Sequence, residues 1–436
     1  MNPTRYASVL GLGFGDCGKG LFVDAMARRW QAHTIVRFNG GAQASHNVVT
    51  AAAHHPFSQF GAATFVRGVQ TLLLDPVIVH PTALLVEAQV LAVAGVSDAF
   101  SRLRIDGQCR ITTPFHQTAG RLRELLRGSA PHGTCGVGVG ETVRHALEHP
   151  HQVLRYADLL HAGVALDKLQ AIRQTLLAEL EPRCSAAHAE ELRMLQSENI
   201  ATEWLNTARA VARQCPPASA EVIYAQLTEA GTVLFEGAQG VLLDEWRGFH
   251  PHTTWSTIST NAVEQALTRF GIHTPVEHYG ALRTYLTRHG VGPLPTEDAS
   301  LDLLPEPHNT TQGWQGRFRR GHPDSVLLQY ALKCVGNLSG LLVSHLDVFK
   351  NTRLKWCSAY QSKHGRLNHL AFAAKPDLTH QQSLTTLLFE ATPVFDPSLI
   401  SSAAVFLDHL AGVTDLPVKM TSHGNTHRDV VEEDHW

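Results

Sequence analysis

A glycine-rich loop between an apolar run and a helical pattern constrains the fold of this chain more than any other segment. The run Ser8–Leu12 is strand-like, glycines recur from position 11 to position 20, and an apolar pattern of helical spacing starts at Leu21. Strand, loop and helix in this order predict the first unit of a parallel α/β sheet. The loop amides and the positive end of the helix bind anions well, and Lys19 adds a cation.

The loop differs from an ordinary nucleotide-binding loop at two positions. From Gly13 it reads G-x-x-x-x-G-K, but Gly20 stands where a P-loop NTPase has the hydroxyl residue that binds magnesium. Asp16 lies inside the loop, where phosphate would repel it unless it binds a metal or takes a proton. The alternative interpretation is a tight turn in which Asp16 caps the helix.

A second apolar run also enters a glycine turn and ends in a histidine. The segment Ile35–Asn47 contains Gly40, Gly41 and His46. Strand, loop, helix, strand and loop would place His46 beside the first loop at the carboxyl edge of the sheet, where such sheets bind ligands. A carboxylate and an imidazole in one crevice are candidate acid–base partners.

These two loops resemble those of the adenylosuccinate synthetase family, whose members join IMP and L-aspartate using GTP. The family reads G-D-E-G-K-G-K where Gly15–Leu21 reads G-D-C-G-K-G-L, and G-G-H-N-A-G-H where Gly40–His46 reads G-G-A-Q-A-S-H. Three later segments follow in family order. Phe235–Asp244 resembles F-E-G-A-Q-G-x-L-L-D, Thr287–Glu297 (T-R-H-G-V-G-P-L-P-T-E) resembles T-R-V-G-x-G-P-F-P-T-E, and Leu338–Val348 contains counterparts of L-S-G and K-L-D-V.

The resemblance implies a magnesium-dependent ligase that first phosphorylates O6 of IMP with GTP and then displaces phosphate with the amine of aspartate. It assigns Asp16 as the base that removes the N1 proton and as a magnesium ligand, and His46 as the acid at the transferring phosphoryl group. It assigns the backbone carbonyl of Ser45 to magnesium, and Gln239 to the catalytic site and to IMP. A homodimer is also implied.

The remaining binding residues carry over by position. For GTP they are Gly15, Gly18, Lys19, Gly20, Arg319, His345, Asp347, Ser422, His423 and Gly424; for IMP and aspartate they are Gln43, Thr134, Cys135, Thr254, Thr310, Thr311 and Arg317. A carboxylate at 347 can accept two hydrogen bonds from guanine, whereas adenine offers no such pair of donors, so GTP is favoured over ATP. Taken alone, Asp347 would more often be a cap or turn residue.

Several positions depart from the family. Gln43 replaces an asparagine, Cys135 replaces a threonine that contacts the IMP phosphate, and His345 replaces a lysine, so ring stacking would replace an aliphatic stem over the guanine. The family loop T-T-G-R-R-R-R corresponds to Asn309–Arg320, which contains an insertion that includes Trp314. No arginine between Val143 and Leu154 aligns with the one that the family supplies across its dimer interface, since Arg144 is out of register.

Composition excludes several classes of function. The formal net charge is −3, so no basic footprint favours nucleic acid, and no apolar run approaches the roughly 20 residues that span a bilayer. The seven cysteines form no C-x-x-C pair, which argues against zinc or disulfides and favours a cytoplasmic location.

The pattern along the 436 residues predicts one α/β domain over 1–436, with a large, mostly parallel central sheet flanked by helices. A helical insertion is expected at about 165–215. The expected helices are Leu84–Ala94, Thr118–Leu126, Asp167–Leu180, Glu190–Arg213 and Ser398–Leu410.

Three functions remain open from the sequence. The first is the ligase that makes adenylosuccinate. The second is a related synthetase with a changed substrate, for example dGMP, which would give 2-aminoadenylosuccinate; retention of Asp16 favours the first. The third is a non-catalytic GTP-binding module, against which the retention of both acid–base candidates weighs.

Overall fold

The computed structural model describes residues 4–306, 309, 313–363 and 365–433. Within these residues, ten strands form one sheet in which only the pairing of β18 with β19 is antiparallel. In spatial order the strands are β19 (Val430–Glu432), β18 (Val418–Ser422), β14 (Gly340–Ser344), β11 (Val276–Arg283), β1 (Arg5–Gly11), β10 (Thr232–Glu236), β2 (Ala32–Arg37), β5 (Gln70–Leu73), β7 (Leu103–Asp106) and β9 (Pro217–Ala218). The expected mostly parallel α/β sheet is confirmed.

Both faces of the sheet are covered, and the central strand β1 shows why. Ala7 and Val9 pack into the hydrophobic cluster on one face, while Tyr6 and Leu10 pack into the cluster on the other. Both faces of this strand therefore pack against apolar layers, as in a parallel sheet between two helical layers, and its buried polar side chain, Ser8, lies 2.7 Å from Nδ1 of His278.

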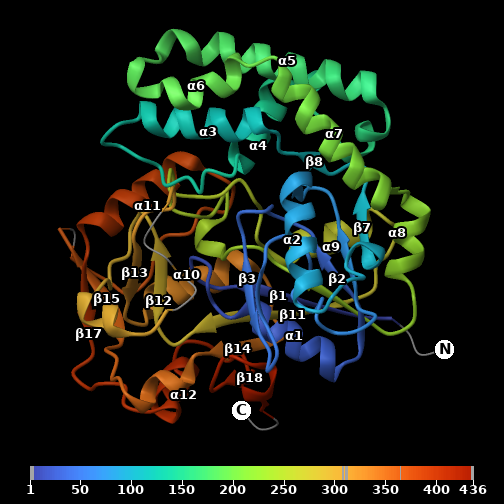
Figure 1. The fold of residues 1–436 in the computed structure, drawn as a ribbon. Helices are drawn as coiled ribbons and strands as arrows, with labels where there is room; N and C mark the ends of the chain where they lie inside the picture. Colours follow the sequence, from blue (N-terminus) through green and yellow to red (C-terminus); the bar gives the residue numbers. More distant parts are fainter. Residues whose placement is uncertain (1–3, 307–308, 310–312, 364, 434–436) are drawn as a thin grey trace.

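Twelve helices are present in the described residues. They are α1 (Lys19–Arg29), α2 (Pro81–Val93), α3 (Pro114–Leu126), α4 (Val139–Glu148), α5 (Ala162–Leu180), α6 (Ala189–Gln196), α7 (Asn199–Gln214), α8 (Ala220–Leu227), α9 (Thr260–Thr268), α10 (Ser325–Val335), α11 (Leu378–Glu390) and α12 (Ala403–Ala411). Helices α3 to α7 form a layer at the top of Figure 1, above the sheet, which agrees with the expected helical insertion.

Four smaller sheets in the described residues are separate from the large sheet. They are the hairpins β3 (His46–Val49) with β4 (His54–Phe57) and β12 (Leu286–His289) with β13 (Phe318–Gly321), the parallel pair β6 (Ile78–Val79) with β8 (Arg110–Ile111), and a sheet of β15 (Cys357–Ser362), β16 (Gly365–Leu367) and β17 (Thr392–Phe395). The hairpin of β12 and β13 matters most for function because it carries His289 and Arg319.

Four of the predicted helices have different boundaries in the structure, for identifiable reasons. Helices α2 and α3 begin earlier than expected because Pro81 and Pro114 each occupy the first turn after a capping side chain. The predicted helix Glu190–Arg213 is two helices, α6 and α7, since the polar residues at 197 and 198 interrupt it. Helix α12 begins at Ala403, where the Ser402 hydroxyl accepts the Val405 N–H.

None of the helices in the described part of the chain is long and apolar enough to cross a membrane. All seven cysteines are free thiols. The single-domain organisation over 1–436 stays a prediction.

Candidate active site

The first glycine loop joins β1 to α1 and brings a buried lysine against a second loop. Gly18 precedes α1 in the left-handed conformation, with φ 81°, which glycine adopts without strain. The Lys19 ammonium is buried and donates to the backbone carbonyl of Gln239 at 2.5 Å. The loop after β1 and the loop after β10 are thereby tied together, as neighbouring parallel strands allow.

Asp16 lies at the tip of this loop with a backbone φ of 34°. Its carbonyl accepts a hydrogen bond from Arg283 Nη1 at 3.0 Å, and its Oδ2 lies 3.5 Å from Nε2 of His289. Burial raises the pKa of the Asp16 carboxyl, but His289, Arg283 and Lys19 outweigh it and hold the pKa below its ordinary value. Asp16 is therefore an ionised acceptor at neutral pH.

His46 begins β3 and lies directly beside the first loop. A Cβ built on Gly20 would stand only 2.9 Å from the His46 Cβ, so a side chain at position 20 would collide with the histidine. The close approach explains why glycine, rather than a hydroxyl residue, occupies this position. The expected proximity of the two loops is confirmed.

The His46 imidazole is held by a fully buried carboxylate. His46 Nδ1 hydrogen-bonds to Glu236 Oε1, and Glu236 Oε2 accepts the Ala62 N–H at 2.9 Å. Burial lowers the pKa of His46 to about 4, Glu236 opposes that change, and Arg37 and Lys19 add to it. Nε2 of His46 has no hydrogen-bond partner among the described residues, so it is the ring nitrogen available to a ligand.

Two side-chain amides lie against the second glycine turn. A Cβ built on Gly40 would lie 3.3 Å from Oε1 of Gln239, and one on Gly41 would lie 3.1 Å from Oε1 of Gln43. Both amides are buried, and neither has a hydrogen-bond partner in the described part of the chain. Unpaired buried amides are rare in folded proteins, and a polar ligand satisfies them.

The residues expected at guanine follow two adjacent strands. His345 and Asp347 come after β14, and Ser422, His423 and Gly424 come after β18, which pairs with β14. The Asp347 carboxylate is half-buried and makes no hydrogen bond or ion pair with any residue that the structure describes. The Ser422 hydroxyl donates to the Gly424 carbonyl at 2.6 Å, which fixes that turn.

The ring of His345 is less open than expected for stacking on a base. Its Nδ1 lies 2.8 Å from the Ser344 hydroxyl, and its ring meets Tyr285 edge-on at 6.0 Å. Burial lowers its pKa well below the ordinary value, and Arg283 adds to this effect. His345 is thus a neutral ring beside the phosphate loop.

The loop expected at the IMP phosphate contacts the insertion near position 314. A Cβ built on Gly136 would lie 2.7 Å from the Trp314 ring, and Arg121 lies over that ring at 5.6 Å while donating to the Gly136 carbonyl at 3.0 Å. The Thr134 hydroxyl accepts the Gly136 N–H at 3.1 Å. Burial raises the pKa of Cys135 to about 11, so this residue is a neutral thiol.

The two arginines expected at substrate anions are engaged with acidic residues of the chain. Arg319 Nη1 donates to Glu297 at 2.8 Å and Nη2 to the Gly292 carbonyl at 2.6 Å. Arg317 is exposed and pairs with Asp302 at 3.2 Å. Thr310 and Thr311 lie outside the described residues.

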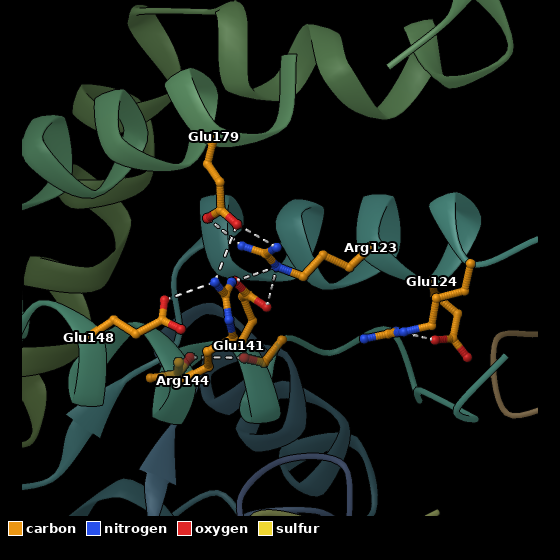
Figure 2. A network of polar contacts seen from close by, with 9 residues as sticks. Arg123, Glu124, Glu141, Arg144, Glu148 and Glu179 are labelled. Atoms are coloured by element: carbon orange, nitrogen blue, oxygen red, sulfur yellow. Dashed lines mark hydrogen bonds and ion pairs between the residues drawn. The ribbon is translucent and has the colours of Figure 1, made fainter. Parts of the chain in front are cut away.

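Arg144 lies in an ion-pair network between α3, α4 and α5. It bonds to Glu141 at 3.0 Å, Glu148 at 2.8 Å and Glu179 at 3.2 Å, and Arg123 bridges Glu141 and Glu179 from the other side, as Figure 2 shows. Three carboxylates surround this guanidinium. Its charge is therefore neutralised within its own chain.

Two assigned residues lie in irregular segments. Ser45 is exposed in the turn before β3. Thr254 is half-buried, and its N–H donates to the Leu243 carbonyl at 2.9 Å. Among the described residues, neither Ser45 nor Thr254 makes a hydrogen bond or ion pair with Asp16.

Three residues at the site had no role in the sequence interpretation. Glu236 holds His46, Arg283 holds the backbone of Asp16, and His289 faces its carboxylate. A charged residue at the last position of a strand beside a glycine loop was the available signal for Glu236 and Arg283. His289 was visible only as an imidazole where the family motif has valine.

Comparison with known proteins gives consistent results. The adenylosuccinate synthetase family model matches residues 8–431. An adenylosuccinate synthetase of Alkalilimnicola ehrlichii is 34% identical over 373 residues, which cover 81% of this chain and 79% of the relative. One of Thioalkalivibrio sulfidiphilus is 28% identical over 435 residues, covering 96% of both chains.

Solved structures show the same fold. The fully ligated adenylosuccinate synthetase of Plasmodium falciparum superposes with a TM-score of 0.79 at 19% identity, over 99% of this chain and 100% of that one. A cyanophage S-2L succinoaminodeoxyadenylate synthetase, bound to dGMP and dATP, gives 0.61 at 14% identity over 99% of this chain and 95% of that one. Given the match of the family model along nearly all of its length, the chain belongs to the adenylosuccinate synthetase family.

Proposed function

We propose that this chain joins IMP and L-aspartate, at the expense of GTP, to form adenylosuccinate. One observation supports the proposal: Asp16, His46 and the Gln239 amide, which has no hydrogen-bond partner among the described residues, come from the loops that follow the neighbouring strands β1, β2 and β10. A carboxylate base, an imidazole and buried amides in one crevice suit phosphoryl transfer to a purine oxygen.

The first step activates a poor leaving group, the oxygen at C6 of IMP. Asp16 takes the proton from N1, and O6 attacks the γ-phosphorus of GTP as the bond to the bridging oxygen of GDP breaks. The free ring is neutral, but phosphate charge beside Nε2 would favour its protonation; Nε2–H then donates to the transferring phosphoryl group while Glu236 accepts from Nδ1 and stabilises the imidazolium. The aspartate amine then attacks C6, phosphate leaves, and the amine loses a proton.

The GTP phosphates are assigned to the loop Gly15–Gly20 and the amino end of α1, which no side chain of the described residues caps and where Lys19 adds a cation. The guanine is assigned to the edge formed by the loops after β14 and β18. Asp347 supports this assignment because its carboxylate has no partner in the part of the chain that the structure describes and can accept both guanine donors.

Magnesium fits the donors present in this crevice. The carboxylate of Asp16 and the backbone carbonyl of Ser45 are hard oxygen ligands, and magnesium usually binds one or two carboxylates together with substrate phosphates. No group of three or more His, Cys, Asp or Glu side chains in the described residues could hold a metal alone. Magnesium would neutralise phosphate charge as it transfers.

Aspartate and the IMP phosphate are assigned to the loops at 309–320 and 133–138. Arg317 is exposed and suits a carboxylate, Arg319 is assigned to GTP, and Thr134, Cys135, Gln43 and Thr254 are assigned to IMP. A homodimer in the cytoplasm is part of the proposal. In that dimer Arg144 would not be the residue that reaches across the interface, since three carboxylates already bind it.

Phosphate release tests the proposed function. Purified protein receives GTP, magnesium, L-aspartate and either IMP or dGMP, each component is omitted in turn, and the product is identified by mass. Release that needs IMP and aspartate together supports the proposal. Release only with dGMP would identify the changed-substrate synthetase, and GTP binding without release would identify a non-catalytic module.

Asp16→Asn gives the sharpest variant because it removes the base and keeps its volume. Turnover should be lost while the melting temperature stays near that of the wild type. Asp24→Asn is the matched control, since Asp24 is a buried carboxylate of α1 that pairs with Arg28 at 2.9 Å and His427 at 3.4 Å, two residues without a role in the proposed chemistry. Substantial activity of Asp16→Asn would contradict the assigned base.

A further inference from the structure

An imidazole faces the proposed base from a position where the family motif has valine. His289 is the last residue of β12 and pairs with Phe318 of β13. Its ring packs on the Phe318 ring with 4.8 Å between centroids and 59° between planes. The hairpin and this aromatic contact fix the direction of the histidine.

The two ring nitrogens of His289 have different surroundings. Nε2 lies 3.5 Å from Asp16 Oδ2, whereas Nδ1 is buried and has no hydrogen-bond partner among the described residues. A neutral imidazole carries one N–H, and an N–H at Nδ1 would be left unpaired in the interior. The N–H is therefore favoured at Nε2, where it faces the carboxylate.

The Asp16 carboxylate has little else to fix it. Arg283 holds the backbone carbonyl, but within the described residues His289 is the one side chain that makes a polar contact with the carboxylate oxygens. The side chain is one-third exposed. A valine at 289 could not donate to it.

We propose that His289 is a positioning residue that donates a hydrogen bond to Asp16 and fixes the direction in which this carboxylate faces the purine ring. The catalytic effect of this contact rests on the proposed function, whereas the contact itself is independent of it. It inverts the arrangement at His46, where a carboxylate orients an imidazole. Here an imidazole orients a carboxylate, and this chain has a support for its base that the family motif lacks.

Three substitutions separate the hydrogen bond from the bulk of the ring. His289→Gln places an amide N–H close to the position of Nε2, whereas His289→Asn reaches only as far as Nδ1, and His289→Val restores the family residue. The asparagine and valine variants should lose about tenfold in kcat, with KM values within about twofold, and the glutamine variant should stay within about threefold of the wild type. Unchanged kcat in the valine variant, or equal losses in glutamine and valine variants, would overturn the proposal.

A double-mutant cycle tests the contact without turnover. Wild type, His289→Val, Asp16→Asn and the double variant are unfolded in urea, with circular dichroism confirming that each one folds. We expect the two substitutions to be non-additive by about threefold or more in the folding equilibrium constant. Additive effects on stability would refute the contact between His289 and Asp16. If the two substitutions are coupled but the wild type shows no turnover, only the proposed function is refuted.

Discussion

The most informative perturbation of this site is Glu236→Gln, because it changes the charge behind His46 without changing volume. Glu236 is fully buried, its Oε1 meets His46 Nδ1, and its Oε2 accepts the Ala62 N–H at 2.9 Å. In the variant the amide oxygen can still accept from Ala62. The amide nitrogen then faces His46, so the ring loses the negative charge that stabilises its protonated form.

The size of the effect follows from the energy of one charged hydrogen bond. Such a bond contributes about 1.5–3 kcal/mol, so kcat should fall by about 10- to 150-fold. The complete burial of Glu236 favours the upper part of this range, because little solvent screens the interaction. KM for GTP and for IMP should change by less than about twofold, since His46 acts on charge that develops during transfer.

Glu87→Gln provides the matched control. Glu87 is also a buried carboxylate beside a histidine, with His55 Nε2 at 3.5 Å, and it accepts the N–H groups of Ser58 at 2.8 Å and Gln59 at 2.9 Å. It lies outside the proposed site, so its substitution should lower the melting temperature and leave kcat unchanged. Steady-state phosphate release and thermal unfolding are measured for both variants. A Glu236→Gln enzyme with kcat within threefold of the wild type would refute the role given to this carboxylate.

Two further predictions concern stability. Burial raises the pKa of Asp324 from 3.8 to about 6, so the stability contributed by its protonated form is complete below pH 3.8 and is lost as pH rises through 6. Relative to Asp324→Asn, the wild-type free energy of unfolding should therefore fall by up to about 3 kcal/mol between acid and neutral pH in urea titrations, and parallel pH profiles would contradict this. Glu141→Gln leaves Arg144 and Arg123 with one fewer buried partner, so the free energy of unfolding should fall by about 3 kcal/mol. Glu148→Gln, at an exposed position, should change it little. Equal losses of stability in the two variants would show that burial of the carboxylate does not decide the loss.

The sequence predicted the sheet and the proximity of the two glycine loops because both depend on local patterns. Strand, loop and helix in succession place Asp16 and His46 at one sheet edge whatever the details of packing. Helix starts were less predictable, since apolar periodicity locates the middle of a helix whereas Pro81 and Pro114 set its beginning.

The pairings of side chains across distant segments could not be predicted. His289 reaches Asp16 only because the hairpin of β12 and β13 folds back over the first loop, and Glu236 reaches His46 from a strand that lies far along the chain. Arg144 shows the difference: Glu141 and Glu148 lie three and four residues away on its own helix, where helical spacing predicts such pairs, whereas its contact with Glu179 of α5 has no local signal.

The position of β10 in the sheet has a consequence for how the protein is made. This strand lies between β1 and β2, the strands that lead into the two glycine loops. Because β10 is synthesised roughly 200 residues after β2, β1 and β2 lack the strand that joins them until then. Pairing between segments so far apart in sequence slows folding. A nascent chain that stops before Thr232 also lacks the Gln239 carbonyl that holds Lys19. We expect such chains to bind no nucleotide and to engage chaperones, so the catalytic crevice is completed late in synthesis rather than at its start.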